Sequence, residues 1–189
     1  MRRVAIIGRS GGGKSTLARK LGAVIGAPVV HLDTLFWRPG WVESEREPFR
    51  ARVAEALSGD AWVADGNFFT SIGDLNIGRA DTIIWIDQPR LLCLGRAIRR
   101  VVFERGGRRP DMAAGCDEKL DLDFYAYIWN WDRDTRPRLQ AAIEDYAPET
   151  PVVCLRRDAE IAAFLEGEAL LEGCREMAAD GTREREAAE

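Results

Sequence analysis

Between residues 8 and 15 the chain reads Gly8-Arg9-Ser10-Gly11-Gly12-Gly13-Lys14-Ser15. This run matches the P-loop motif G-x-x-x-x-G-K-[ST] at every fixed position. The apolar run 4–7 precedes it and is typical of a strand buried on both faces of a parallel sheet. Residues 14–25 follow it, with apolar side chains at helical spacing. A chance glycine-rich turn would need strand, spacing, Lys-Ser pair and helix to coincide, so the sequence predicts a phosphate-binding loop.

The motif assigns a task to each part of this loop, and we expect the bound nucleotide to be ATP. Glycines let the backbone wrap closely around phosphate oxygens, and the N-terminus of the next helix adds partial positive charge. Lys14 is expected to reach the β- and γ-phosphates, Ser15 to coordinate Mg²⁺ and Thr16 to approach the α-phosphate. The predicted nucleotide-binding residues of the loop are Gly8, Ser10, Gly11, Gly12, Gly13, Lys14, Ser15 and Thr16.

Four further apolar runs follow the loop, at residues 28–32, 61–64, 82–86 and 151–155. The stretches 14–25, 46–57 and 90–103 carry apolar stripes at helical spacing. Strands that alternate with helices indicate a parallel sheet, because parallel strands need right-handed crossover connections. The sequence therefore predicts an α/β fold of three layers around a five-stranded parallel sheet.

Composition limits the possible classes of protein. A chain of 189 residues with 46% hydrophobic side chains is long enough for one substantial core and short for two domains. The net charge of −4 gives no overall attraction to nucleic acid or anionic membranes. The four cysteines are far apart and form no C-x-x-C pair, which argues against a zinc site or a disulfide framework. With no signal-peptide pattern and no apolar run of membrane-spanning length, we expect a soluble, cytoplasmic protein.

Two segments interrupt the alternation of strands and helices. Residues 104–117 combine glycine, proline and arginine without periodicity, which predicts a mobile loop inside a domain that covers residues 1–170. Residues 171–189 are rich in Glu, Arg and Ala, and they have too little apolar surface to offset the entropy lost on ordering. We expect that charged tail to be frayed.

Four segments outside the P-loop carry a resemblance to a known family: HLDTLFW at 31–37, WVADGN at 62–67, RRPDM at 108–112 and RPRL at 136–139. On these residues, over about residues 1–165, the chain resembles the adenylate-kinase-like P-loop kinases. Within that branch it is most similar to the DNA topology modulation proteins. The resemblance implies the P-loop nucleoside triphosphate hydrolase fold, the sheet order 2-3-1-4-5 and an arginine-bearing lid at about 104–117. That family name describes a phenotype and does not define a reaction.

Asp33 and Asp65 each follow a predicted strand, at the sheet edge where open α/β folds bind ligands. By the resemblance, Asp65 matches the aspartate that holds magnesium through water, and Asp33 lies where related kinases contact the acceptor. A carboxylate there can orient the attacking hydroxyl or accept its proton. The alternative is that either aspartate caps the next helix.

Arginines cluster before and after the predicted lid. Arg96 and Arg100 lie four residues apart on one helical face, and the resemblance places Arg133 and Arg136 at the far lid hinge. Guanidinium groups brought in by a closing lid would stabilise the charge of phosphoryl transfer, although a solvated basic helix face is the alternative. The predicted catalytic residues are Lys14, Asp33, Asp65, Arg100, Arg133 and Arg136; Arg96 and Arg100 are predicted to bind the nucleotide, and Ser15 and Asp65 the metal.

The chain also departs from nucleoside monophosphate kinases. Where those enzymes clamp the acceptor phosphate with arginines, this sequence has Phe36, Phe68 and Phe69. Phe36, Trp37 and Trp41 either line an acceptor pocket or pack the helical cover. His31, the only histidine, is expected to be hydrogen-bonded and partly buried, and Trp129 and Trp131 are expected to pack in a helix.

These features favour an ATP-dependent, magnesium-requiring phosphotransferase that acts on a small molecule, its acceptor undefined. A rival hypothesis is a nucleotide-dependent switch or DNA-associated regulator, which the family name and the basic run 96–109 favour. The acidic net charge and the lack of a helix-turn-helix oppose it. A third hypothesis, ATP hydrolysis, differs from the first only in using water as the acceptor.

Overall fold

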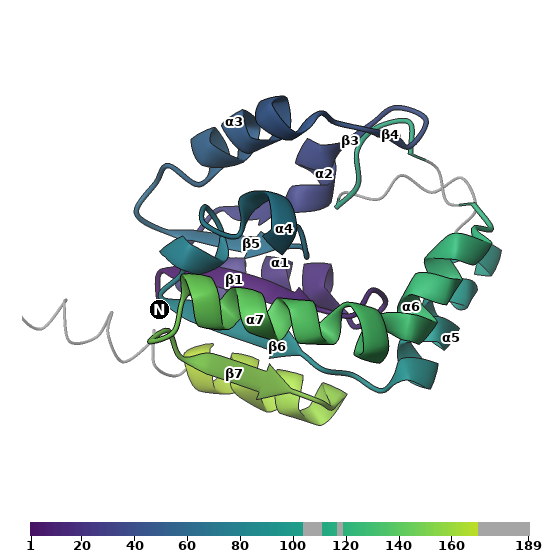
Figure 1. Cartoon of the computed structure of the whole chain (residues 1–189). Helices are drawn as coiled ribbons and strands as arrows, with labels where there is room; N and C mark the ends of the chain where they lie inside the picture. The colour runs from purple at the N-terminus through teal and green to yellow at the C-terminus, as the bar shows by residue number, and fades with distance from the viewer. Residues whose placement is uncertain (104–110, 117–118, 170–189) are drawn as a thin grey trace, which may run out of the picture.

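The computed structural model describes residues 1–103, 111–116 and 119–169. The predicted lid arginines Arg105, Arg108 and Arg109, and the predicted tail, lie outside the described residues. Five parallel strands form the central sheet in the order β2-β5-β1-β6-β7 (Figure 1). Their bounds are β1 (Arg3–Gly8), β2 (Val29–His31), β5 (Trp62–Asp65), β6 (Thr82–Ile86) and β7 (Val152–Leu155).

The predicted fold class is confirmed. Two further strands, β3 (Trp37–Arg38) and β4 (Val42–Glu43), form a separate antiparallel hairpin that was not predicted. Counted along the chain without this hairpin, the strands of the large sheet lie in the order 2-3-1-4-5. The P-loop strand β1 is therefore at the centre, between β5 and β6.

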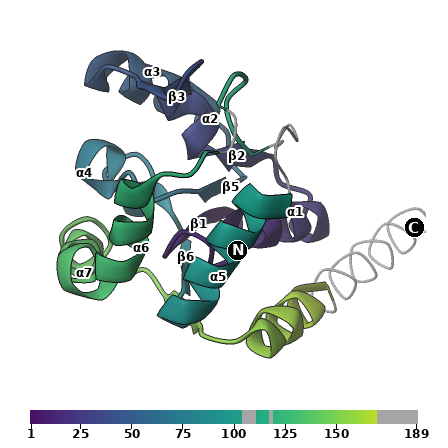
Figure 2. The same ribbon diagram turned by 90° about the vertical axis from the view of Figure 1, so that its right-hand side faces the viewer.

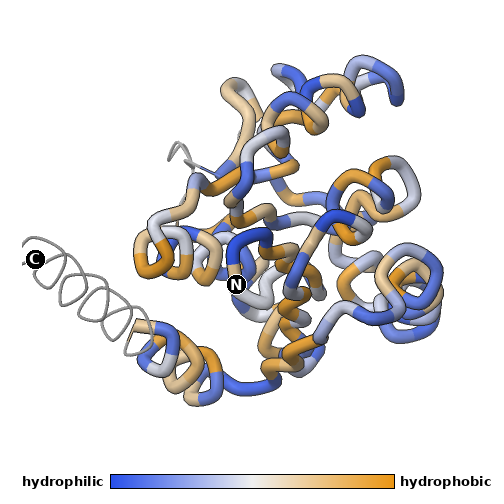
Figure 3. The backbone as a smooth tube through the Cα atoms, turned by 90° about the vertical axis from the view of Figure 1, so that its left-hand side faces the viewer, coloured by the Kyte–Doolittle hydropathy of each residue, from blue (hydrophilic) through white to orange (hydrophobic). Residues whose placement is uncertain are grey.

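Helices cover both faces of the sheet (Figures 1 and 2). The α-helices are α1 (Lys14–Ile25), α2 (Leu32–Phe36), α3 (Arg46–Ala56), α4 (Phe69–Ile72), α5 (Arg90–Phe103), α6 (Leu122–Asp134) and α7 (Arg136–Tyr146), with a 3-10 turn η1 (Ile77–Arg79) and a further helix over 158–169. Along the outer helices hydrophobic and hydrophilic residues alternate, as expected for helices with one buried face (Figure 3).

Strand β1 divides the core into two layers. Ala5 and Ile7 pack into the cluster under α3, α4 and α7, while Val4 and Ile6 pack into the cluster under α1 and the helix at 158–169. All four side chains are fully buried. Because successive side chains of a strand point to opposite faces, only an uninterrupted apolar run can fill both layers.

Helices α6 and α7 meet at Thr135. Pro137 lies in the first turn of α7, where its missing N–H is not needed, so it begins that helix and does not kink it. Trp131 is 1% exposed and packs in the core as predicted. Trp129 is 46% exposed, so the prediction that it packs is wrong; the Arg90 guanidinium lies 4.8 Å from the centre of its ring.

No helix within the described part of the chain has both the length and the apolar character to span a bilayer.

The start of β1 is fixed by a carboxylate from the turn before β6. Asp81 Oδ2 accepts hydrogen bonds from the backbone amides of Arg2 and Arg3, each at 2.9 Å. Burial raises the pKa of this carboxyl, but the two amides and the Thr82 hydroxyl outweigh burial, so its pKa is lowered. The charged form is therefore the one that stabilises the fold.

Replacing Asp81 by Asn is expected to lower the stability by about 1–2 kcal/mol at pH 7, because charge-assisted hydrogen bonds are lost. The pKa is lower in the folded state, so the stabilisation is present above the unfolded pKa of about 3.9 and is lost as the pH falls through the folded value. Thermal unfolding of both proteins from pH 7 to pH 3 measures this. The exposed Asp60→Asn variant is the control, and a stability difference that does not shrink below pH 4 would contradict the assignment.

Candidate functional site

Three glycines of the P-loop have the positive φ angles that favour glycine. They are Gly8 (φ 136°), Gly11 (φ 82°) and Gly13 (φ 96°). A Cβ on Gly8 would lie 2.1 Å from the carbonyl oxygen of Ile86, and one on Gly11 would lie 2.3 Å from that of Cys93. The loop is therefore wedged against β6 and α5, and its shape cannot accommodate side chains at these positions.

Lys14 and Ser15, the first residues of α1, direct their side chains back toward the loop and the sheet. Lys14 Nζ donates to the carbonyl oxygens of Gly8 (2.9 Å) and Arg9 (3.2 Å). Burial lowers the pKa of Lys14, against the opposing effect of the nearby Asp65 and Asp33 carboxylates. Thr16 is exposed at the next position of the helix.

Asp65 ends β5 and is the buried centre of the site, with 3% of its surface exposed. Its Oδ2 accepts a hydrogen bond from Ser15 Oγ at 2.7 Å, and its Oδ1 contacts His31 Nδ1. The sheet register pairs Asp65 with both Ile6 and His31, so β2 and β5 end at the same level, while β1 continues two residues further to Gly8. Ser15 and Asp65, the two residues predicted to hold the metal, are thus hydrogen-bonded to each other, and their metal-binding role stays a prediction.

His31 is hydrogen-bonded and mostly buried, as predicted, with 12% of its side chain exposed. Burial lowers the pKa of this imidazole, but its contact with the Asp65 carboxylate outweighs burial, so the pKa of His31 is raised. Its structural effect is to hold one carboxylate oxygen of Asp65 while Ser15 binds the other.

Asn67 was not identified from the sequence, although it closes the quoted Asp65-Gly66-Asn67 segment. Its Oδ1 accepts from the amide of Gly8 at 3.0 Å, and its Nδ2 donates to the carbonyl of Gly8 at 2.8 Å. These two bonds resemble a backbone pair of the sheet and connect the segment after β5 to the first residue of the P-loop. An Asn two residues after the strand-ending Asp was the only signal for it in the sequence.

Asp33 lies within α2 and is half-buried. Burial lowers the pKa of Lys14 and raises that of Tyr127 on α6; the negative charge of Asp33 opposes the first effect and adds to the second. Burial is the larger effect on Tyr127 and raises its pKa to about 12. Neither aspartate caps a helix, because the residue that caps α2 is His31 and the one that caps α4 is Phe68. The capping alternative is thereby excluded for Asp33 and Asp65.

The predicted arginines do not form one group. Arg100 is half-buried, and its charge lowers the pKa of Lys14, so it lies near the loop. Arg96 pairs with Asp158 at 2.6 Å, which links α5 to the segment after β7. Arg96 is a residue of α5, and within the described part of the chain its side chain is hydrogen-bonded to Asp158 and not to the P-loop.

The two arginines after the predicted lid differ sharply. Arg136 binds both carboxylate oxygens of Asp87, at 2.9 and 3.0 Å, and lies 5.3 Å from the ring centre of Trp85. Arg133 is 74% exposed and pairs with its neighbour Asp134 at 2.6 Å. The expectation that Arg133 joins the site is not met, because position 133 is on the solvent face of α6 while Trp131 occupies the buried face.

The aromatic residues that were candidates for an acceptor pocket lie in two places, the hydrophobic core and the β3–β4 hairpin. Phe36 and Phe68 contact Phe49 at ring distances near 5.1 Å and pack against the core, which supports the packing alternative for Phe36. Trp37 and Trp41 stand edge to face at 5.4 Å in the β3–β4 hairpin. Only these two tryptophans remain as candidates for contact with an acceptor ring.

The described end of the predicted lid contacts this hairpin. The amide of Gly40 donates to the carbonyl of Gly115 at 2.8 Å, and Cys116 Sγ lies 3.2 Å from the carbonyl of Arg38. Lys119 Nζ is 5.9 Å from the ring centre of Trp41. Residues 111–116 are thus bonded to the β3–β4 hairpin.

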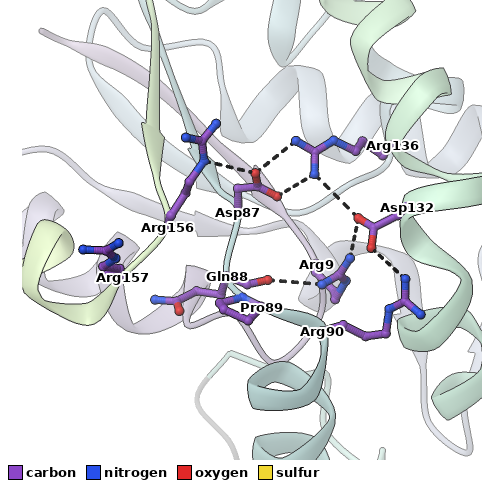
Figure 4. Close-up of a pocket in the computed structure, with 9 residues that line it drawn as sticks. All are labelled: Arg9, Asp87, Gln88, Pro89, Arg90, Asp132, Arg136, Arg156 and Arg157. Carbon is purple, nitrogen blue, oxygen red and sulfur yellow. Dashed lines mark hydrogen bonds and ion pairs between the residues drawn. The ribbon is translucent and has the colours of Figure 1, made fainter.

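A cavity of about 330 Å³ opens beside the P-loop, at the carboxyl ends of β6 and β7 (Figure 4). Five arginines and two aspartates dominate its lining, which comprises Arg9, Asp87, Gln88, Pro89, Arg90, Asp132, Arg136, Arg156 and Arg157. Most of these side chains are joined to one another by ion pairs, and through Arg9 these ion pairs connect to the P-loop.

Comparison with known proteins adds a fold-level result. No protein-family model and no curated protein matches the sequence. Among solved structures, the chain is similar to shikimate kinase from Acinetobacter baumannii in complex with shikimate, with a TM-score of 0.58 and 16% identity over 92% of this chain and 94% of that one. It is also similar to shikimate kinase from Bacteroides thetaiotaomicron, with a TM-score of 0.53 and 16% identity over 90% and 98% of the two chains. The chain therefore has the P-loop fold of these two kinases, over nearly its whole length.

Proposed function

We propose that this protein is a magnesium-dependent phosphotransferase that moves the γ-phosphoryl group of ATP to a small molecule. The observation that carries the proposal is the hydrogen bond between Ser15 and the buried Asp65, directly beneath a P-loop that presents Lys14. A hydroxyl and a carboxylate at this distance behind a phosphate-binding loop form a typical P-loop kinase site. The similarity to two shikimate kinases supports the same class of fold.

The residues present fit a magnesium ion. Mg²⁺ prefers oxygen ligands and is usually held by one or two protein groups together with substrate phosphates. Ser15 Oγ and Asp65 Oδ2 lie 2.7 Å apart and offer such oxygens, whereas the described residues contain no cluster of three or more His, Cys, Asp or Glu suited to a metal. When bound, magnesium would neutralise phosphate charge during transfer. Asp65 is oriented for this task by His31 on its other oxygen.

The loop itself would bind and orient the phosphates. Its backbone amides and the N-terminus of α1 favour anions, and Lys14 adds a full positive charge beside them. Because burial already disfavours the charged form of Lys14, a phosphate group is a better partner for it than the two neutral carbonyls it now contacts. Arg100, near Lys14, is the arginine we propose for charge stabilisation, and Arg96 for the nucleotide side.

Asp33 is the residue we propose to act on the acceptor. Its negative charge acts on both Lys14 and Tyr127, so an acceptor hydroxyl bound at this carboxylate would also be exposed to the charge of the phosphate-binding lysine. The carboxylate would orient that hydroxyl and accept its proton as the new phosphate bond forms. We do not assign a catalytic task to Arg133, and we regard Arg136 as a scaffold residue because Asp87 holds it in a two-bond pair.

Among the described residues, Arg50 and Arg52 on α3 do not form an acceptor-phosphate clamp, because other groups already bind them. Arg50 is held by Asp74 and by the carbonyl of Ser71, and Arg52 by the carbonyl of Leu35 and by Ser44, the last at 2.7 Å. These contacts favour a hydroxylated small molecule over a nucleoside monophosphate as acceptor.

The test is ADP release by the purified protein with Mg²⁺ and ATP, across nucleosides, nucleotides, sugars and hydroxylated carboxylic acids. Transfer to one of these classes, well above the rate with water, supports the proposal. Tight ATP binding with no transfer to any of them would instead favour the nucleotide-dependent switch. Sub-micromolar DNA binding that does not depend on ATP and falls steeply with salt would favour the DNA-associated regulator.

Replacing Lys14 by Ala is expected to reduce turnover by about 10²-fold or more, because a charge aimed at the transferring phosphate is lost. The fold should remain intact, since the lysine contacts only loop carbonyls. ADP release and thermal unfolding are measured side by side, with the exposed Lys20→Ala variant on the same helix as control. Normal ATP binding and turnover in a folded Lys14→Ala protein would refute the phosphate-binding loop.

Substitutions of Asp65 and Asp33 are expected to impair activity in different ways. Asp65→Asn should raise the magnesium requirement and lower turnover with every acceptor, including water, because the lost charge acts on the metal. Asp33→Asn should leave ATP affinity and hydrolysis nearly unchanged and lower transfer to the acceptor by about 10² to 10⁴.

Transfer and hydrolysis are measured in both variants over a range of magnesium concentrations. If Asp33→Asn impairs hydrolysis as strongly as transfer, Asp33 belongs to the metal site and the acceptor assignment is wrong.

A further inference from the structure

Arg9 is the only residue between Gly8 and Gly13 with a long side chain, and that side chain extends toward Gln88 and Asp132 (Figure 4). Arg9 is 3% exposed. Its Nη1 donates to the carbonyl of Gln88 at 3.1 Å, and its Nη2 pairs with Asp132 Oδ1 at 2.5 Å. Among the described residues its Nε has no hydrogen-bond partner, and Asp132 is the carboxylate that pairs with this buried cation.

Asp132, on α6, is the common partner of three arginines (Figure 4). In addition to Arg9 it contacts Arg90 at 3.2 Å and Arg136 at 3.6 Å. Burial raises the pKa of Asp132, but the arginines outweigh burial and lower it, so the carboxylate is held in its charged form. One side chain thus joins the P-loop, the start of α5 and the start of α7.

The physical reason for such an anchor lies in the composition of the loop. Glycine-rich backbone has more conformational freedom than any other, so a loop with glycines at positions 8, 11, 12 and 13 needs restraints from outside. Asn67 restrains the backbone of Gly8, and the Arg9 side chain restrains the next residue of the loop, Arg9 itself. A buried guanidinium without its carboxylate is strongly unfavourable and would turn toward solvent, taking the loop backbone with it.

We infer that Asp132 is a positioning residue of the P-loop, which acts through Arg9 and makes α6 part of the phosphate-binding scaffold. The inference rests on the proposed function only for its effect on turnover; its effect on the loop is independent of any substrate. Asp132 touches neither the Lys14 nor the Asp65 side of the site, so its task is to fix where the loop amides lie.

The first test needs no substrate. Hydrogen–deuterium exchange of the loop amides at 9–13 is compared in the wild-type chain, Asp132→Asn and the control Asp134→Asn, which removes an exposed carboxylate two residues along the same helix. Exchange in the loop should accelerate by about 10-fold or more in Asp132→Asn and remain unchanged in Asp134→Asn. Unchanged loop protection in a folded Asp132→Asn protein would overturn the inference.

The second test is a double-mutant cycle of Arg9→Gln and Asp132→Asn, read as ADP release and as direct ATP binding. A small displacement of the loop is expected to lower kcat by about 10²-fold, while the Kd of ATP changes less, because alignment matters most in the transition state. The double variant should be no worse than the poorer single variant, and Asp132→Glu should recover part of the loss. Additive losses, or a loss of binding equal to the loss of kcat, would overturn the inference.

The two tests also separate the two proposals. If the wild-type chain turns over no ATP but its loop loosens in Asp132→Asn, the phosphotransferase proposal fails and the positioning inference stands. If turnover is present and neither exchange nor kcat responds to Asp132→Asn, the positioning inference fails alone.

Discussion

The buried carboxylate of Asp65 is the constraint on which the rest of the site depends. It ends the strand next to β1, and its two oxygens hold the first turn of α1 through Ser15 and the end of β2 through His31. A charge buried to this degree is tolerated only when it has partners. The ends of β2 and β5 and the first turn of α1 must therefore meet at Asp65 for the fold to be stable. The same requirement brings a hydroxyl, a carboxylate and the phosphate-binding loop together, so stability and chemistry rest on one contact.

The loop is restrained on both sides by side chains that are not part of its motif. Asn67 pairs with the backbone of Gly8, and Arg9 reaches in the opposite direction to Gln88 and Asp132. The catalytic geometry of a P-loop depends on where its amides lie, yet its glycines contribute no packing to hold them. In this chain the contacts come from Asn67, just after β5, and from Asp132 on α6, and the P-loop motif includes neither residue.

The sequence predicted the sheet and the P-loop, because these follow from apolar runs and a motif with fixed spacing. It also named Ser15 and Asp65 as metal ligands, two side chains that are in contact in the structure. It did not predict the β3–β4 hairpin, whose strands are two residues long and show no alternation. Nor could it separate Arg133 from Arg136, since the helix break at Thr135 decides which one faces Asp87 and which one faces solvent. The tasks of Asn67 and Asp132 depend on contacts across more than 50 residues, which no local pattern encodes.

The hairpin and residues 111–116 cannot vary independently of one another. Gly115 has a φ of 78°, and a Cβ there would lie 3.0 Å from Pro39 Cβ, while the Gly115 carbonyl accepts the amide of Gly40. An inserted residue in either segment would shift one half of this contact and leave the other half without its partner. Among relatives of this chain, changes in the length of the segment after α2 should therefore be accompanied by compensating changes some 75 residues later, even though the two regions are far apart in sequence.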